Sequence, residues 1–148
     1  MRLLLAVGVL VAVGVAAAAP VPKGKPKPKD EDAILGAWQL ETMEVNGKVL
    51  PAATEGMRFT FKKGNLQLSL VGKPKVQDGT FKLDTVAKPK AIDIDEGRGR
   101  NSLGIYELDG NKLKICLDEG KAPARPTEFK AARKGVLVFT LTRVAEDK

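Results

Sequence analysis

Residues 34–42 read ILGAWQLET and contain the only tryptophan of the chain, Trp38. Apolar and polar residues alternate through most of this stretch, and successive side chains of a β-strand point to opposite faces. The stretch therefore predicts a first strand, one face of which carries Gly36, Trp38, Leu40 and Thr42. The opposite face is expected to carry Ala37, Gln39, Glu41 and Met43.

The same alternation continues downstream in short runs separated by turn residues, which is typical of an all-β domain. After the tight-turn signal Asn46-Gly47, residues 48–51 form a loop or a short edge strand. Further strands are expected at 57–62, 66–71, 79–84, 91–95, 103–108, 113–118, 127–131 and 136–143. The sequence thus predicts an all-β fold, a small antiparallel up-and-down β-barrel of eight or nine strands, with a two-sheet sandwich as the alternative.

One face of these strands is apolar and the other polar, as a closed small barrel needs. The residues expected inside are Trp38, Leu40, Met57, Phe59, Phe61, Leu66, Leu68, Leu70, Phe81, Leu83, Ile92, Ile94, Tyr106, Leu108, Leu113, Ile115, Leu117, Phe129, Leu137, Phe139 and Leu141. Arg143 falls in the inward phase of the last strand. In a closed barrel the first and last strands are neighbours, and the Arg143 guanidinium can lie over the Trp38 indole. The alternative is that Arg143 ends its strand in solvent.

The first 19 residues form a targeting segment that we expect to be removed. Arg2 provides a positive start, an apolar run follows to Val15, and alanines at 16–19 suit a signal peptidase. The run is short for a bilayer span, which needs ~20 residues, and an uncleaved membrane anchor is the alternative. The predicted domains are a signal peptide at 1–19, a linker at 20–30 and a barrel at 31–148, in an exported protein that is periplasmic or secreted.

The linker alternates lysine with proline, so it cannot bury apolar surface and favours an extended chain. It is a solvated spacer, or a tether to an anionic envelope surface. The formal net charge of the chain is +7, but Arg2 and four linker lysines supply five of its 25 basic residues. Residues 30–148 therefore hold 20 basic and 18 acidic side chains, a near balance that argues against nucleic-acid binding.

The chain has one cysteine, Cys116, and no histidine. An intrachain disulfide and a zinc site of several thiolates are therefore excluded, and no imidazole can activate a nucleophile. Cys116 is expected to be a buried strand residue, with an intermolecular disulfide or reactive thiol as the alternative. We expect no enzymatic activity, no catalytic residue, no metal and no cofactor.

Two polar groups deserve consideration as sites. The loop at 96–101 contains two glycines and either binds an anion or is a long hairpin loop. Asp93 and Asp95 share one strand face, where they either bind Ca²⁺ or are simply solvated. In both cases the second interpretation is favoured.

Gly36-x-Trp38 near the start of the chain and Arg143 near its end resemble the lipocalin signature, in which such a pair and a late arginine close one end of a barrel. The order of the motifs more closely resembles a lipocalin-like domain family of unknown function that is abundant in planctomycete bacteria. The matching segments are 35–38, 45–48, 79–84, 88–93, 104–110, 113–117, 125–129 and 141–143. The resemblance implies a β-barrel closed by Gly36, Trp38 and Arg143, often in an exported protein, and it implies no activity.

Two functions are compatible with these features. The first is binding of a small apolar or amphipathic ligand inside the barrel, with the candidate contacts Trp38, Phe59, Phe61, Tyr106 and Phe139. The second is a barrel filled by its own side chains that acts as a protein-interaction or cell-envelope scaffold module. An interior cavity above ~300 Å³ favours the first function, and a solid interior favours the second.

Overall fold

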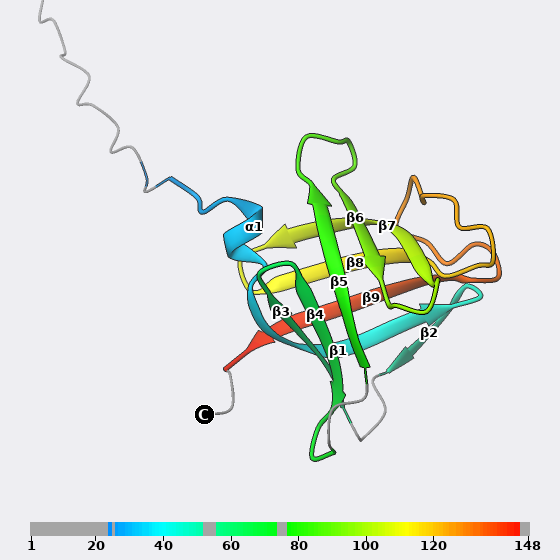
Figure 1. Ribbon diagram of the computed structural model, residues 1–148, viewed down its shortest axis with the longest axis horizontal. Coiled ribbons are helices and arrows are strands. Elements are labelled where there is room, and N and C mark those ends of the chain that lie inside the picture. The colour runs from blue at the N-terminus through cyan, green and yellow to red at the C-terminus, as the bar shows by residue number, and fades with distance from the viewer. Residues whose placement is uncertain (1–23, 25, 52–55, 74–76, 146–148) are drawn as a thin grey trace, which may run out of the picture.

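The structure, a computed structural model, describes residues 24, 26–51, 56–73 and 77–145 (Figure 1). The predicted signal peptide and part of the predicted linker lie outside these residues. One helical turn precedes nine strands in the described part of the chain. The elements are α1 (Asp30–Ala33), β1 (Gly36–Val45), β2 (Lys48–Pro51), β3 (Met57–Lys62), β4 (Asn65–Leu70), β5 (Gln77–Asp84), β6 (Ala91–Asp95), β7 (Asn101–Asp109), β8 (Lys112–Asp118) and β9 (Val136–Val144).

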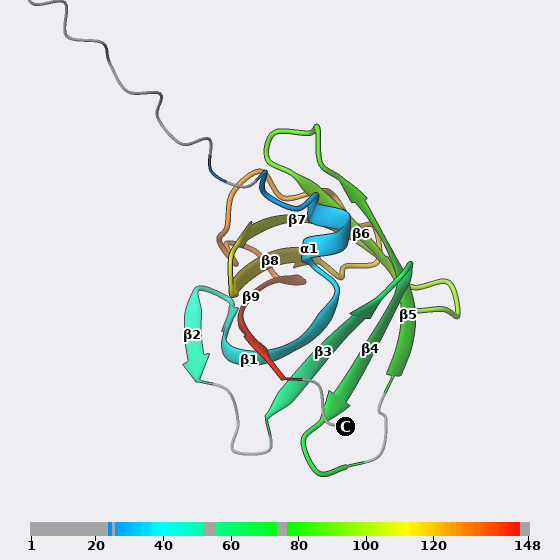
Figure 2. The ribbon, with the colours of Figure 1, turned by 90° about the vertical axis from the view of Figure 1, so that its left-hand side faces the viewer.

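Eight of the strands form a closed antiparallel barrel. Strands β3 to β8 each pair with the next strand in the chain, β3 also pairs with β1, and pairing of β1 with β9 closes the ring. Figure 2 looks into this ring, with β2 standing outside it. Strand β2 pairs with the second half of β1 and with no other described strand. The predicted up-and-down barrel is confirmed, and the sandwich alternative is wrong.

A β-bulge in β1 changes which side chains face the core. Leu40 pairs with Leu141 of β9, but Thr42 already pairs with Thr140, so Glu41 is the extra residue. One extra residue reverses the alternation of faces beyond it. Met43 therefore packs against the barrel core, and the prediction that placed Thr42 on the inner face and Met43 on the outer face is wrong.

The interior of the barrel is a continuous apolar core that matches most of the predicted inward set. Its buried members are Ile34, Trp38, Leu40, Phe59, Phe61, Leu66, Phe81, Ile92, Ile94, Tyr106, Leu113, Ile115, Leu117, Phe139 and Leu141. Gly104 shows how tightly this core is packed, because an added Cβ would lie 2.5 Å from both the Cys116 carbonyl oxygen and the Leu117 Cδ2 atom. No real Cβ tolerates such contacts, so the strands approach closely at this point.

A second, smaller core lies on the outer face of β7, β8 and β9, under the long connection at 119–135. It consists of Ile105, Cys116, Ala131, Val136 and Val138, with Phe129 packed against it. Phe129 was predicted inside the barrel on a strand at 127–131; no strand forms there, and the side chain covers the outer sheet instead. Cys116 is fully buried in this cluster, which confirms its prediction as a buried strand residue, and burial raises the pKa of its thiol.

Candidate functional site

The end of the barrel nearest α1 is closed by Trp38 and Arg143, which are direct partners across β1 and β9. The Arg143 guanidinium lies 4.2 Å from the centre of the indole ring, donates a 2.7 Å hydrogen bond to the Leu35 carbonyl and also bonds to the Ala33 carbonyl. The indole Nε1 donates to the Ile34 carbonyl at 2.8 Å. The predicted stacking is therefore present, and both side chains hold the residues that connect α1 to β1.

Gly36 is the third member of this closure. Its φ of +114° is one that residues with a side chain rarely adopt, and an added Cβ would lie 3.0 Å from the Arg143 Nη1 atom. A glycine at this position lets the guanidinium reach the indole. The three residues predicted to close the barrel are thus brought together.

Asp30 attaches the single turn of α1 to the barrel wall. Its Oδ2 accepts hydrogen bonds of 2.7 Å from the Tyr106 hydroxyl and from the Lys90 ammonium. Partial burial would raise the pKa of Asp30, but these two donors outweigh it and hold the pKa below its usual range. The pKa of Tyr106 is raised, first by burial and then by the Asp30 carboxylate.

The five residues predicted to contact an interior ligand all belong to the buried core of the barrel. Each is at most 5% exposed, and they are Trp38, Phe59, Phe61, Tyr106 and Phe139. The Phe59 ring lies 5.4 Å from that of Phe139, and the Phe61 ring lies 5.0 Å from that of Phe81 in an edge-to-face contact. Such ring pairs fill space and contribute beyond their buried area. The side chains at these five positions therefore pack against other side chains of the core.

The opposite end of the barrel carries polar residues in inward-facing positions. Ser102 pairs with the core residue Ile94, and Gln77 pairs with Leu68, which packs against the core, so both side chains share the inner face. Glu96 and Glu119 follow the core residues Ile94 and Leu117 by two positions. We call Gln77, Glu96, Ser102 and Glu119 the polar rim. Sequence reasoning missed it, although extending the inward phase past the strand ends would have found all four positions.

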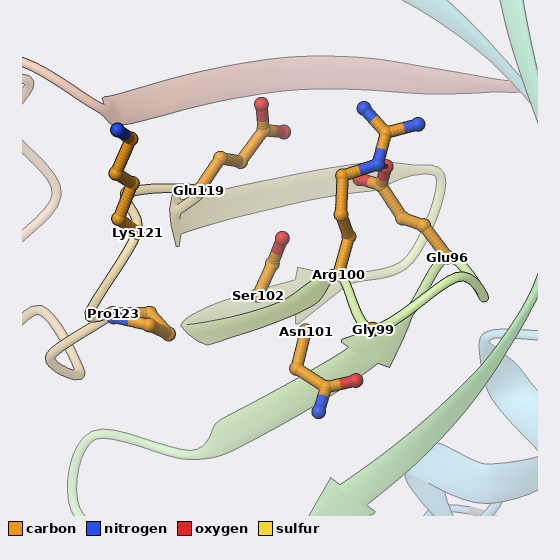
Figure 3. A pocket seen from close by; sticks show the side chains of 9 residues that line it. Glu96, Gly99, Arg100, Asn101, Ser102, Glu119, Lys121 and Pro123 are labelled. Carbon is orange, nitrogen blue, oxygen red and sulfur yellow. Dashed lines mark ion pairs between the residues drawn. The ribbon is translucent and has the colours of Figure 1, made fainter.

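A cavity of about 580 Å³ opens beside the polar rim (Figure 3). One wall comes from the β6–β7 loop and the start of β7, including Glu96, Arg100 and Ser102, and the other from Glu119 and Lys121 after β8. The Gln77 amide donates to Glu96 Oε2 at 2.8 Å, while the Arg100 Nε atom is 3.9 Å from the same oxygen. Partial desolvation raises the pKa of Glu119, repulsion from Glu96 adds to this, and Arg100 opposes it.

Asp118 positions the second wall of the cavity. This fully buried carboxylate accepts hydrogen bonds from the backbone N–H groups of Gly120 (2.9 Å) and Ala124 (2.8 Å) and pairs with Arg133 at 2.5 Å. Burial alone would raise the pKa of Asp118, but these donors lower it. Charge-assisted bonds of this kind are strong, so the start of the 119–135 connection is firmly held.

The two polar groups considered from the sequence have structural partners. Asp93 forms a 2.7 Å ion pair with Arg125, which also donates to the Gly104 carbonyl at 2.7 Å, and Asp95 accepts a hydrogen bond from the Gly97 backbone. The segment 96–101 is a hairpin connection between β6 and β7, with a positive φ of 57° at Arg98. Within the described residues, no group of three or more His, Cys, Asp or Glu side chains could hold a metal ion.

In the part of the chain that the structure describes, no helix has the length and apolar character needed to cross a bilayer. Comparisons of the chain with protein-family models, with curated proteins and with solved structures found no match.

Proposed function

We propose that this protein is an exported, non-enzymatic, lipocalin-like module that works through its outer surface, as a protein-interaction or cell-envelope scaffold module. The observation that carries this proposal is the interior of the barrel, where Phe59 packs on Phe139 and Phe61 on Phe81. A barrel filled by its own side chains has a stable shape and leaves its surface as the functional part.

Two exposed apolar positions support action through the surface. Val86, in the β5–β6 connection, is 85% exposed, and Val49 on β2 is 64% exposed. The loop around Val86 is held by Asp84, whose Oδ1 accepts hydrogen bonds from the backbone N–H groups of Val86 (3.1 Å) and Ala87 (3.0 Å). Val86 is thus an apolar side chain that a hydrogen-bonded loop holds in water, and it is the position at which we test contact with another protein.

The alternative proposal is a small apolar or amphipathic ligand inside the barrel. It requires Phe59, Phe139 and their neighbours to make room for the ligand, because these side chains pack against one another inside the barrel. Such a rearrangement exposes well-packed rings and carries a cost that the ligand has to offset.

Native mass spectrometry of the mature protein, purified from its own cells, separates these two proposals. We expect the mass of the polypeptide without a co-purified apolar molecule. A lipid or pigment bound in equal molar amount would overturn the surface proposal in favour of the interior ligand. The N-terminal residue of the same sample tests export, because removal of residues 1–19 is expected and an intact first segment would contradict it.

A photo-crosslinking side chain placed at residue 86 tests the surface directly in living cells, with the exposed Lys82 of β5 as the matched control position. We expect one discrete adduct from position 86 and none from position 82, and we expect Val86→Ser to abolish the same complex without changing the melting temperature. Equal cross-linking from both positions, or none from position 86, would contradict this surface.

The tether proposal adds that binding to anionic vesicles needs the linker lysines and weakens with salt.

A further inference from the structure

We propose that the cavity beside the polar rim binds a small zwitterion, a molecule of amino-acid or short-peptide size with one free carboxylate and one free ammonium group. This site does not depend on the surface function proposed above. It lies at the end of the barrel opposite α1, where β6 ends and β7 begins (Figure 1).

The first support is the side chain of Ser102, whose hydroxyl has no hydrogen-bond partner among the described residues. Ser102 is 3% exposed, lines the cavity and makes no side-chain hydrogen bond to any described residue. In Figure 3 its side chain points from β7 toward the space between Glu119 and Arg100. The hydroxyl is therefore available to donate a hydrogen bond to, or accept one from, a polar molecule in the cavity.

The second support is that charges of both signs are left without ion pairs around the cavity. Neither the Glu119 carboxylate nor the Lys121 ammonium makes a hydrogen bond or ion pair within the described part of the chain. Arg100 has a 3.9 Å contact with Glu96, whose carboxylate already accepts the bond from Gln77, and its charge also acts on Glu119. The cavity therefore offers one free anionic group on one wall and cationic groups on both walls.

The charges select the class of ligand. A carboxylate is matched by the planar fork of Arg100, with Lys121 as a second cation, and an ammonium group is matched by Glu119. A molecule with two anionic groups could pair with Arg100 and Lys121 but would leave Glu119 without a cation, and the titration therefore includes succinate as a competitor class. A neutral sugar would form no ion pair with these groups, which are exposed to water in the free protein.

The size and stiffness of the cavity also fit. Its volume of about 580 Å³ lies within the range of pockets for small molecules, ~300–1,000 Å³. One wall is fixed by the bonds of Asp118 to Gly120 and Ala124, and the other by the hydrogen bond between Gln77 and Glu96. A site whose walls are already held loses little freedom when it binds a ligand.

The test is a titration of the mature protein with L-alanyl-L-alanine, followed by backbone amide NMR shifts. Two matched probes each lack one charge: the N-acetylated dipeptide and the dipeptide amide. We expect saturable shifts at residues 99–102 and 119–121 with the free dipeptide, and binding weaker by ~10-fold or more with either blocked probe. Equal binding of a blocked probe, tighter binding of succinate or putrescine, or no shift at these residues would overturn the proposal.

Variants then assign the two charged contacts. Glu119→Gln is expected to reduce the affinity for the free dipeptide, so that the free and the N-acetylated dipeptide bind equally. Arg100→Gln is expected to make the free dipeptide and the dipeptide amide bind equally. Glu107→Gln, on the exposed part of β7, is the matched control and is expected to change neither. If both cavity variants keep the wild-type selectivity while remaining folded by Trp38 fluorescence, the assignment is wrong.

Discussion

Replacing Arg143 by methionine tests the closure of the barrel most directly. Methionine keeps much of the apolar stem but removes the guanidinium, which lies 4.2 Å from the Trp38 ring and donates to the carbonyls of Leu35 and Ala33. Hydrogen bonds from a charged donor contribute ~1.5–3 kcal/mol each. The stacking on the indole adds ~0.5–2 kcal/mol. Because Arg143 is only half-buried, water can replace part of this, and we expect a loss of about 3 kcal/mol in the free energy of unfolding.

Equilibrium unfolding in guanidinium chloride measures this loss, followed by the fluorescence of Trp38, the only tryptophan. Arg98→Met is the control, because Arg98 is exposed in the β6–β7 connection, and its effect is expected to stay within ~0.5 kcal/mol. Arg143→Lys is expected to fall between the two, since an ammonium group lacks the planar fork. A loss below ~1 kcal/mol for Arg143→Met would refute the view that this residue closes the barrel.

Four further predictions concern other parts of the fold. Gly104→Ala is expected to lower the melting temperature clearly, because its Cβ would lie 2.5 Å from Leu117; an unchanged value would show that the strands can separate there. Asp30→Asn should destabilise the protein at neutral pH and cease to do so in acid. The pKa of Asp30 is lower in the folded state than in the unfolded state, where it is ~3.9, so the ionised carboxylate stabilises the fold above pH ~3.9. This stabilisation is lost as the pH falls through the folded-state pKa. Unfolding measured at pH 7 and pH 3 checks this, and an equal difference at both would contradict it. Asp118→Asn should weaken the start of the 119–135 connection by ~1–3 kcal/mol, seen as faster amide exchange at Gly120 and Ala124, while unchanged exchange would count against its role. Deleting residues 20–29 should leave the melting temperature nearly unchanged, and a large drop would mean that this segment packs on the barrel.

The mouth of the barrel shows what single-strand patterns miss. The inward phase of β7 and β8, continued past their apolar residues, leads to Ser102 and Glu119, so both were accessible from the sequence. The sequence did not show that these two residues line one cavity with Arg100 and Lys121, because this depends on how the β6–β7 connection and the chain after β8 lie across the rim. Asp118 places the chain after β8 through bonds to residues as far as Ala124 and Arg133, six and 15 positions away, and alternation does not encode such a relation.

The sequence by itself determined most of the strands and the apolar inner face, because a period of two residues is a local property. It offered the stacking of Arg143 on Trp38 as one of two alternatives, since a closed ring makes the first and last strands neighbours, and the structure pairs the two residues. Only the tertiary structure decided that Met43 faces inward and that Phe129 lies outside the barrel. The first depends on a bulge against β9, and the second on a connection folded over an apolar outer surface. Both result from contacts between distant segments, which the local order of residues does not specify.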